Sequence, residues 1–285
     1  MKLFLRKNII IENYSKPNAV HLDEIDEIAK ALPATINSEI KIPQDVINSF
    51  EIKSNLNPEF WTNEKLNPDI RETLLTIATD FFDGLELPSN VKIKDIVFTG
   101  SLANFNWSKF SDVDIHIVLD FGQIEGNDEL IQKFFDAQKN LWNLKHDITI
   151  HNFPVEIYAQ DAKSKLHATA VYSVKNDKWI LKPSKEELRI NKNVIRNKAL
   201  KFVSKLKDIR KDYENQDYAS AIEKAEALGK KIKNYRTSGL EGGGEYSMEN
   251  LVFKVLRRSP FMEILNDYKA KAYDAEQSLD EDMML

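Results

Sequence analysis

The sequence contains no cysteine, which excludes disulfide bonds and thiolate metal ligands from this chain. It also has no apolar run approaching the roughly 20 residues that a membrane-spanning helix needs, so the sequence predicts no membrane association. The five histidines show no spacing typical of a zinc site. We therefore expect a cytoplasmic protein, and we expect oxygen atoms to dominate any metal site.

The charge of the chain is unevenly distributed along its 285 residues. Residues 182–236 contain 16 Lys or Arg and 8 Asp or Glu, a net charge of +8. Since the whole chain carries −5, the remainder carries −13. A basic helical segment beside an acidic region suits a polyanionic ligand, such as a nucleoside triphosphate, RNA or DNA.

The most informative motif is Gly100-Ser101, followed about ten residues later by Asp112-Val113-Asp114. Residues 93–99 and 115–119 are predicted strands, the first ending at the glycine. Alternate residues of a strand point to the same side, so Asp112 and Asp114 project together, with His116 on the same face. Two adjacent carboxylates repel each other, and a divalent cation bound by oxygen relieves this repulsion. Mg²⁺ or Mn²⁺ fits such ligands better than zinc.

The predicted strand at residues 148–158 supplies one candidate for a third carboxylate beside these two. Glu156 alternates with the apolar residues Val155 and Ile157, so it faces away from the core. Asp147 is a rival for this role and Asp161 a weaker one. At this stage the sequence leaves the choice open, with Glu156 preferred.

The pattern apolar-Gly-Ser, about ten residues, then Asp-apolar-Asp-apolar resembles the DNA polymerase β-like nucleotidyltransferase superfamily. Only Thr99, directly before the glycine, departs from it. The segments 100–107, 141–148 and 249–254 are similar to uncharacterised nucleotidyltransferases encoded by large tailed phages. That likeness covers most of the chain from residue 57 onward, and it would place the protein in the host cytoplasm.

The resemblance implies an α+β fold, with a small mixed, palm-like β-sheet core flanked by helices and a C-terminal helical domain. It also implies a metal-dependent enzyme that transfers a nucleoside monophosphate from ATP or another NTP to an acceptor hydroxyl, with release of pyrophosphate. The acceptor would be an RNA end, a small molecule or a second nucleotide. Two alternatives stay open: a catalytically silent nucleotide- or RNA-binding module, and a protein-nucleotidylating enzyme.

The resemblance also assigns roles to individual residues. Catalysis and the binding of Mg²⁺ or Mn²⁺ fall to Asp112, Asp114 and Glu156. The backbone amides of Gly100 and Ser101, at the start of a short helix, would hold phosphates of the nucleotide. The nucleotide-binding residues expected in full are Gly100, Ser101, Ser111, Lys198 and Lys201. The two lysines are expected from the basic helix that follows the strands, where Lys205 is an open alternative.

Three parts are expected along the chain: an accessory segment (residues 1–56), the catalytic core (57–183) and the helical domain (184–285). A strand hairpin is expected at 168–181, and the Gly-rich stretch 236–245 is expected to be a connector or a loop over phosphates. The buried stripe of the helix at 127–142 is expected to consist of Leu130, Phe134, Gln138, Leu141 and Trp142. Helices are predicted at 22–32, 69–82, 127–142, 184–213, 217–236 and 247–275.

Overall fold

The computed structural model describes residues 41–164, 168–185 and 190–278. These fall into two compact units. The sheet unit comprises the described residues of Glu51–Glu187, and the helical unit those of Met1–Phe50 and Leu188–Leu285. The division into three parts at residues 56/57 and 183/184 stays a prediction, and the helix expected at 22–32 lies outside the described residues.

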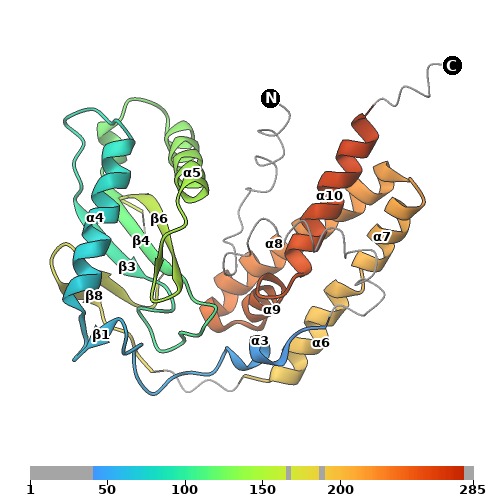
Figure 1. Cartoon of the computed structure of the whole chain (residues 1–285), viewed down its shortest axis with the longest axis horizontal. Coiled ribbons are helices and arrows are strands. Elements are labelled where there is room, and N and C mark those ends of the chain that lie inside the picture. Colours follow the sequence, from blue (N-terminus) through green and yellow to red (C-terminus); the bar gives the residue numbers. More distant parts are fainter. Residues whose placement is uncertain (1–40, 165–167, 186–189, 279–285) are drawn as a thin grey trace. The chain divides into compact units, whose positions relative to one another are not determined.

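The sheet unit is built on a mixed six-stranded sheet with the order β5-β6-β4-β3-β7-β8 (Figure 1). In that order the strands are β5 (Thr149–Ile150), β6 (Phe153–Asp161), β4 (Val113–Leu119), β3 (Asp95–Thr99), β7 (Val171–Ser173) and β8 (Lys178–Leu181). Only β4 and β6 run parallel, and the other neighbours are antiparallel. The small mixed sheet of an α+β fold is therefore confirmed, as is the hairpin formed by β7 and β8.

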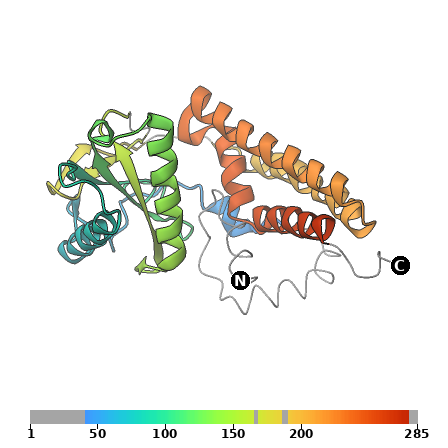
Figure 2. The same ribbon diagram turned by 90° about the horizontal axis from the view of Figure 1, so that it is seen from above.

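Two helices flank this sheet, α4 (Pro68–Gly84) and α5 (Asp128–Lys145), as Figures 1 and 2 show. Phe81 of α4 meets Trp142 of α5 edge to face, with ring centroids 5.4 Å apart. The predicted core side of α4 is confirmed, because Ile70, Leu74 and Ile77 are buried. The smaller elements of the unit are the hairpin strands β1 (Trp61–Thr62) and β2 (Lys65–Leu66) and the short helix η1 (Phe121–Gln123).

The predicted buried side of α5 is confirmed at Trp142, which packs against the core, but it is wrong by one residue at Leu130 and Phe134. Leu130 is 60% exposed and Phe134 37%, whereas Ile131 and Phe135 are buried. Apolar residues occur in adjacent pairs along this helix, so its periodicity fits two neighbouring stripes equally well. Tertiary packing selects one of them: Phe135 stacks on Phe121 with ring centroids 4.5 Å apart.

The helical unit consists of helices joined by short connections, with α8 and α10 side by side (Figure 2). Its elements are α3 (Gln44–Asn48), α6 (Lys192–Val203), α7 (Leu206–Glu214), α8 (Tyr218–Gly243), η2 (Gly244–Tyr246), α9 (Met248–Arg257) and α10 (Phe261–Gln277). A C-terminal helical region is therefore confirmed.

Two of the long helices predicted for this unit are each divided in two. The first begins only at Lys192, where the side chain of Asn191 accepts a hydrogen bond from the Val194 amide at 3.1 Å, and it breaks before α7. The second breaks between α9 and α10 at Pro260, which has no amide hydrogen to continue a helix. Hydrophobic periodicity runs across such breaks, so it did not reveal them.

The Gly-rich stretch 236–245 is mostly helix, so the expected loop is wrong there. α8 continues to Gly243 and ends at Gly244, whose φ is +69°. Inside the helix, Gly239 lies close to the start of α9: a Cβ at this position would lie 2.7 Å from Ser247 Oγ and 3.2 Å from the Asn250 nitrogen. Two helices can approach this closely because the residue at their contact lacks a side chain.

Candidate metal centre

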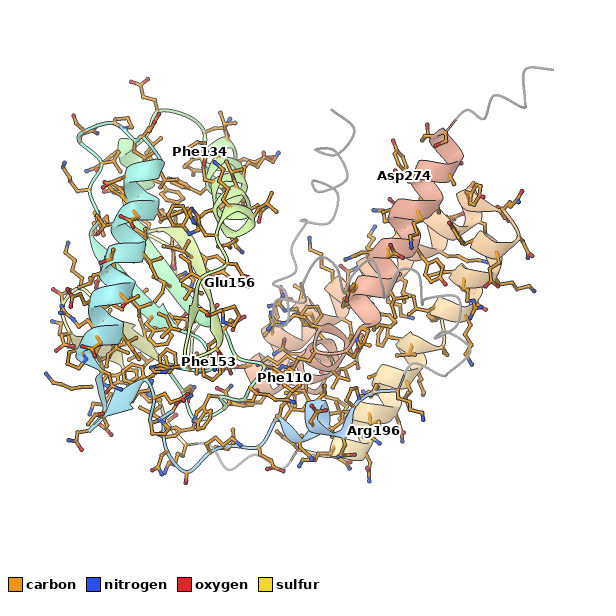
Figure 3. All side chains as sticks on the ribbon, viewed as in Figure 1. Phe110, Phe134, Phe153, Glu156, Arg196 and Asp274 are labelled. Carbon is orange, nitrogen blue, oxygen red and sulfur yellow. The ribbon has the colours of Figure 1, made fainter. Side chains whose placement is uncertain are left out.

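Three carboxylates meet where β4 and β6 run side by side. Asp114 and Glu156 are register partners on these parallel strands, and Asp112 directly precedes β4. One ligand oxygen from each lies within 4.8 Å of the other two, and all three side chains are half-buried. Figure 3 labels Glu156 on β6, and Phe153 where that strand begins. An all-carboxylate donor set of this size suits Mg²⁺ or Mn²⁺.

The two rival carboxylates do not belong to this group. Asp147 is exposed before β5. Asp161 ends β6 and accepts a hydrogen bond from the Phe121 amide at 3.2 Å, which fixes the turn after β4. Of the three candidates, the structure thus brings Glu156 to Asp112 and Asp114.

Gly100 lies against the carboxylates because β3 pairs antiparallel with β4, so that Thr99 is opposite Asp114. Its φ is +77°, a conformation that side chains other than hydrogen disfavour. A Cβ at this position would collide with the Asp114 carboxylate oxygen Oδ2. The glycine is therefore required twice, once for the turn and once for the position of the Asp114 side chain.

The loop between β3 and β4 contains no helix, so the short helix expected after Gly100-Ser101 is wrong. Hydrogen bonds hold the loop instead: Ser101 Oγ donates to Ser111 Oγ at 2.7 Å, and the Ser108 amide donates to the same Ser111 oxygen at 3.0 Å. Trp61 Nε1 donates to the Leu102 carbonyl at 2.7 Å. Without a helix, any phosphate contact from Gly100 and Ser101 would depend on turn amides alone.

A second group of side chains adjoins the carboxylates, and only His116 among them was singled out from the sequence. Tyr158 lies on β6 opposite His116, and its hydroxyl donates a hydrogen bond to Glu156 Oε2. Lys139 of α5 places its Nζ 3.9 Å from the centre of the Tyr158 ring. The spacing of Glu156 and Tyr158, two residues apart on one strand, was the available signal for this contact.

Burial and neighbouring charges shift the pKa values of this second group. Burial lowers the pKa of His116 to about 4, so its imidazole is neutral at pH 7. Burial, together with the carboxylates of Asp114 and Glu156, raises the pKa of Tyr158 well above its ordinary value. Burial lowers the pKa of Lys139, while the nearby carboxylates, Glu156 foremost, oppose that shift.

The predicted nucleotide-binding lysines belong to α6 of the helical unit. Lys198 donates a hydrogen bond to the Tyr235 hydroxyl at 3.4 Å, and Lys201 is exposed in the last turn. Their contact with a nucleotide stays a prediction, as do the roles of Gly100, Ser101 and Ser111.

Comparisons with known proteins agree with this geometry. Residues 85–213 match the family described as "Nucleotidyltransferase domain", a match that spans the carboxylate group and extends through α6. No curated protein and no solved structure matches the chain. In the described part of the chain, no helix combines the length and the apolar character that crossing a bilayer requires. The match covers a little under half of the chain, and it supports a polymerase β-like nucleotidyltransferase domain in residues 85–213 and, with it, an enzyme that transfers nucleotidyl groups.

Proposed function

We propose that the protein uses Mg²⁺ or Mn²⁺ to transfer a nucleoside monophosphate from a nucleoside triphosphate to an acceptor hydroxyl, releasing pyrophosphate. The observation that carries this proposal is the group formed by Asp112, Asp114 and Glu156 beside Gly100. Three half-buried carboxylates this close together repel one another, and a bound divalent cation would relieve that repulsion.

In the proposed reaction, the acceptor oxygen forms a bond to the α-phosphorus while the bond from that phosphorus to the bridging oxygen breaks. The acceptor hydroxyl gives up its proton to solvent water, and the β- and γ-phosphates leave together as pyrophosphate. Asp112, Asp114 and Glu156 hold the divalent cation. When bound, it supplies positive charge that offsets the charge of the triphosphate and of the leaving group. Gly100 and Ser101 orient the phosphates through turn amides, and Ser111 fixes the Ser101 hydroxyl.

The helical unit is proposed to contribute positive charge to the same substrate or to the acceptor. Lys198 and Lys201 of α6 are the candidates, and the family match extends over this helix. The acceptor is an RNA end, a small molecule or a second nucleotide, and ATP is one of the candidate donors. A cytoplasmic location and a relationship to the phage-encoded group remain part of the proposal.

The deciding experiment incubates the protein with each α-³²P-labelled NTP and Mg²⁺ or Mn²⁺, with and without total tRNA. We expect labelled RNA or a labelled nucleotide product, and we expect Asp112→Asn/Asp114→Asn to lower the rate by about 1,000-fold or more, because charge stabilisation carries this type of catalysis. The matched control is Asp80→Asn/Asp83→Asn, which removes two exposed carboxylates of α4 and should leave the rate unchanged.

Each other outcome has a definite meaning. Label on the protein itself would indicate a protein-nucleotidylating enzyme. Nucleotide binding without any transfer, and without metal binding at Asp112 and Asp114, would overturn the proposal in favour of a silent binding module. Equal loss of activity in the two double variants would show that the effect is not specific to the metal centre.

A further inference from the structure

We propose that Tyr158 and Lys139 are positioning residues that hold Glu156 in place for the divalent cation before the cation binds. This inference rests on the proposed function, since it assigns these two residues a role at the same metal centre. Neither residue is part of the nucleotidyltransferase motif quoted above.

The first step is the hydrogen bond from the Tyr158 hydroxyl to Glu156 Oε2. Both residues lie on β6, and residues two apart on a strand share one face, so the contact follows directly from the backbone. Glu156 has three side-chain torsions and would otherwise sample several orientations beside Asp114. A hydroxyl donor on one carboxylate oxygen restricts those orientations and still leaves the other oxygen for a cation.

The second step is that the tyrosine is itself held. Its ring stacks on His116 of the neighbouring strand, with centroids 5.0 Å apart and planes inclined by 18°. The Lys139 ammonium lies over the ring at 3.9 Å, a distance at which a cation is attracted to the face of an aromatic ring. The donor that fixes Glu156 is therefore supported by contacts to β4 and to α5.

The third step concerns charge. Three carboxylates whose oxygens lie within 4.8 Å of one another repel strongly when no cation is present. Lys139 interacts electrostatically with Glu156, Asp114 and Asp112, so one built-in positive charge offsets part of this repulsion. The lysine reaches this place because it follows Ile131 and Phe135 at steps of four residues, on the inward side of α5.

Together these contacts describe a metal site whose third ligand is fixed in advance. Groups that orient a metal ligand typically change metal affinity by about 10- to 100-fold when they are removed. Loss of the Tyr158 hydroxyl should therefore weaken cation binding even in the absence of nucleotide and acceptor.

The test measures Mn²⁺ binding to the full chain without nucleotide, using the EPR signal of free Mn²⁺. Tyr158→Phe keeps the ring, with its contacts to His116 and Lys139, and removes only the donor. We expect its dissociation constant for Mn²⁺ to rise about 10-fold. The matched control is Tyr172→Phe, which removes a hydroxyl that donates to Asp177 at 2.7 Å elsewhere in the sheet unit, and should change the constant by less than about twofold.

A second pair of variants tests the charge. Lys139→Met removes the ammonium and keeps the apolar stem. We expect it to lower the melting temperature of the metal-free protein and to tighten Mn²⁺ binding, because the cation no longer meets a like charge beside the carboxylates. Added Mn²⁺ should restore most of the lost melting temperature, since the cation then supplies the missing charge. Lys133→Met, which breaks an exposed pair with Glu129 on the same helix, should do neither.

The outcomes separate this inference from the proposed function. If the wild-type protein binds Mn²⁺ through Asp112 and Asp114 but Tyr158→Phe binds it equally well or more tightly, this inference is overturned and the proposed function stands. If the wild-type protein shows no binding that depends on Asp112 and Asp114, the metal centre is absent and both fail. A lower melting temperature in Tyr158→Phe with unchanged Mn²⁺ affinity would indicate a role in folding alone, which also overturns the inference.

Discussion

The sheet unit and the helical unit differ in one arrangement of charge, a cluster of carboxylates that the described part of the chain has only in the sheet unit. In the sheet unit, Asp112, Asp114 and Glu156 gather three like charges on one face of β4 and β6. The described residues of the helical unit form no such group, and ion pairs there join opposite charges, as Lys269 and Glu226 do at 3.0 Å. Exposed pairs change stability by less than about 1 kcal/mol, whereas clustered like charges destabilise the folded chain. The sheet unit therefore maintains an arrangement that stability alone does not favour, as expected of a functional site.

The largest expected loss of stability comes from a substitution in the buried core of the sheet unit, which supports the strands that carry the carboxylates. Phe135→Ala removes a fully buried ring from the core of the sheet unit, where it stacks on Phe121. We expect a loss of about 3–5 kcal/mol in the free energy of unfolding of this unit, measured by urea denaturation followed by tryptophan fluorescence.

The adjacent residue provides the control. Phe134→Ala removes a ring of the same size from the same helix, but this ring is 37% exposed, and Figure 3 labels it on α5. We expect a cost below about 1 kcal/mol. Equal losses from the two variants would mean that the orientation of α5 described above is wrong.

The orientation of α5 is also a feature that the sequence alone could not predict. Local alternation along β4 was sufficient to place Asp112 and Asp114 on one side, because a strand allows only two directions for a side chain. A helix allows many directions, and the paired apolar residues of α5 left two stripes open. Lys139 lies on the inward stripe only in the observed orientation, so its approach to Tyr158 could not be derived from the sequence.

The pairing of strands that lie far apart in the sequence set a second limit on what the sequence could predict. The sequence offered Glu156, Asp147 and Asp161 as the third carboxylate, and the parallel register of β4 and β6 decides which of them lies beside Asp114. In the helical unit, the break at Pro260 had a local signal that the apolar periodicity concealed. Motif spacing thus predicted the centre of the site, whereas packing determined its surroundings.

An intermediate loss of stability is expected from a substitution at Gly100, where the backbone approaches the carboxylates. Gly100→Ala places a Cβ at a φ of +77° and against Asp114 Oδ2, so it combines backbone strain with displacement of a proposed metal ligand. We expect a loss of about 1–3 kcal/mol in stability, together with a fall of about 100-fold in the nucleotidyl-transfer rate.

Gly126→Ala separates these two causes. Gly126 also has a positive φ, +145°, but its Cβ would meet only Ile131, at 3.4 Å. We expect a comparable cost in stability with the transfer rate unchanged within about twofold. If Gly126→Ala lowered the rate as much as Gly100→Ala, strain in the sheet unit would explain the effect, and contact with Asp114 would not.

The smallest change in the free energy of unfolding is expected in the helical unit, and it is a gain in stability. Gly229 lies inside α8, and a Cβ added there would meet nothing within 4 Å. Gly229→Ala should therefore raise the free energy of unfolding by about 0.5–1 kcal/mol, because alanine loses less backbone entropy in a helix than glycine does.

Gly239→Ala in the same helix should destabilise instead, since its Cβ would lie 2.7 Å from Ser247 Oγ. Circular dichroism during thermal unfolding measures both changes. A destabilising Gly229→Ala would contradict this expectation, because it would show that this part of α8 is as tightly constrained as the turn at Gly100.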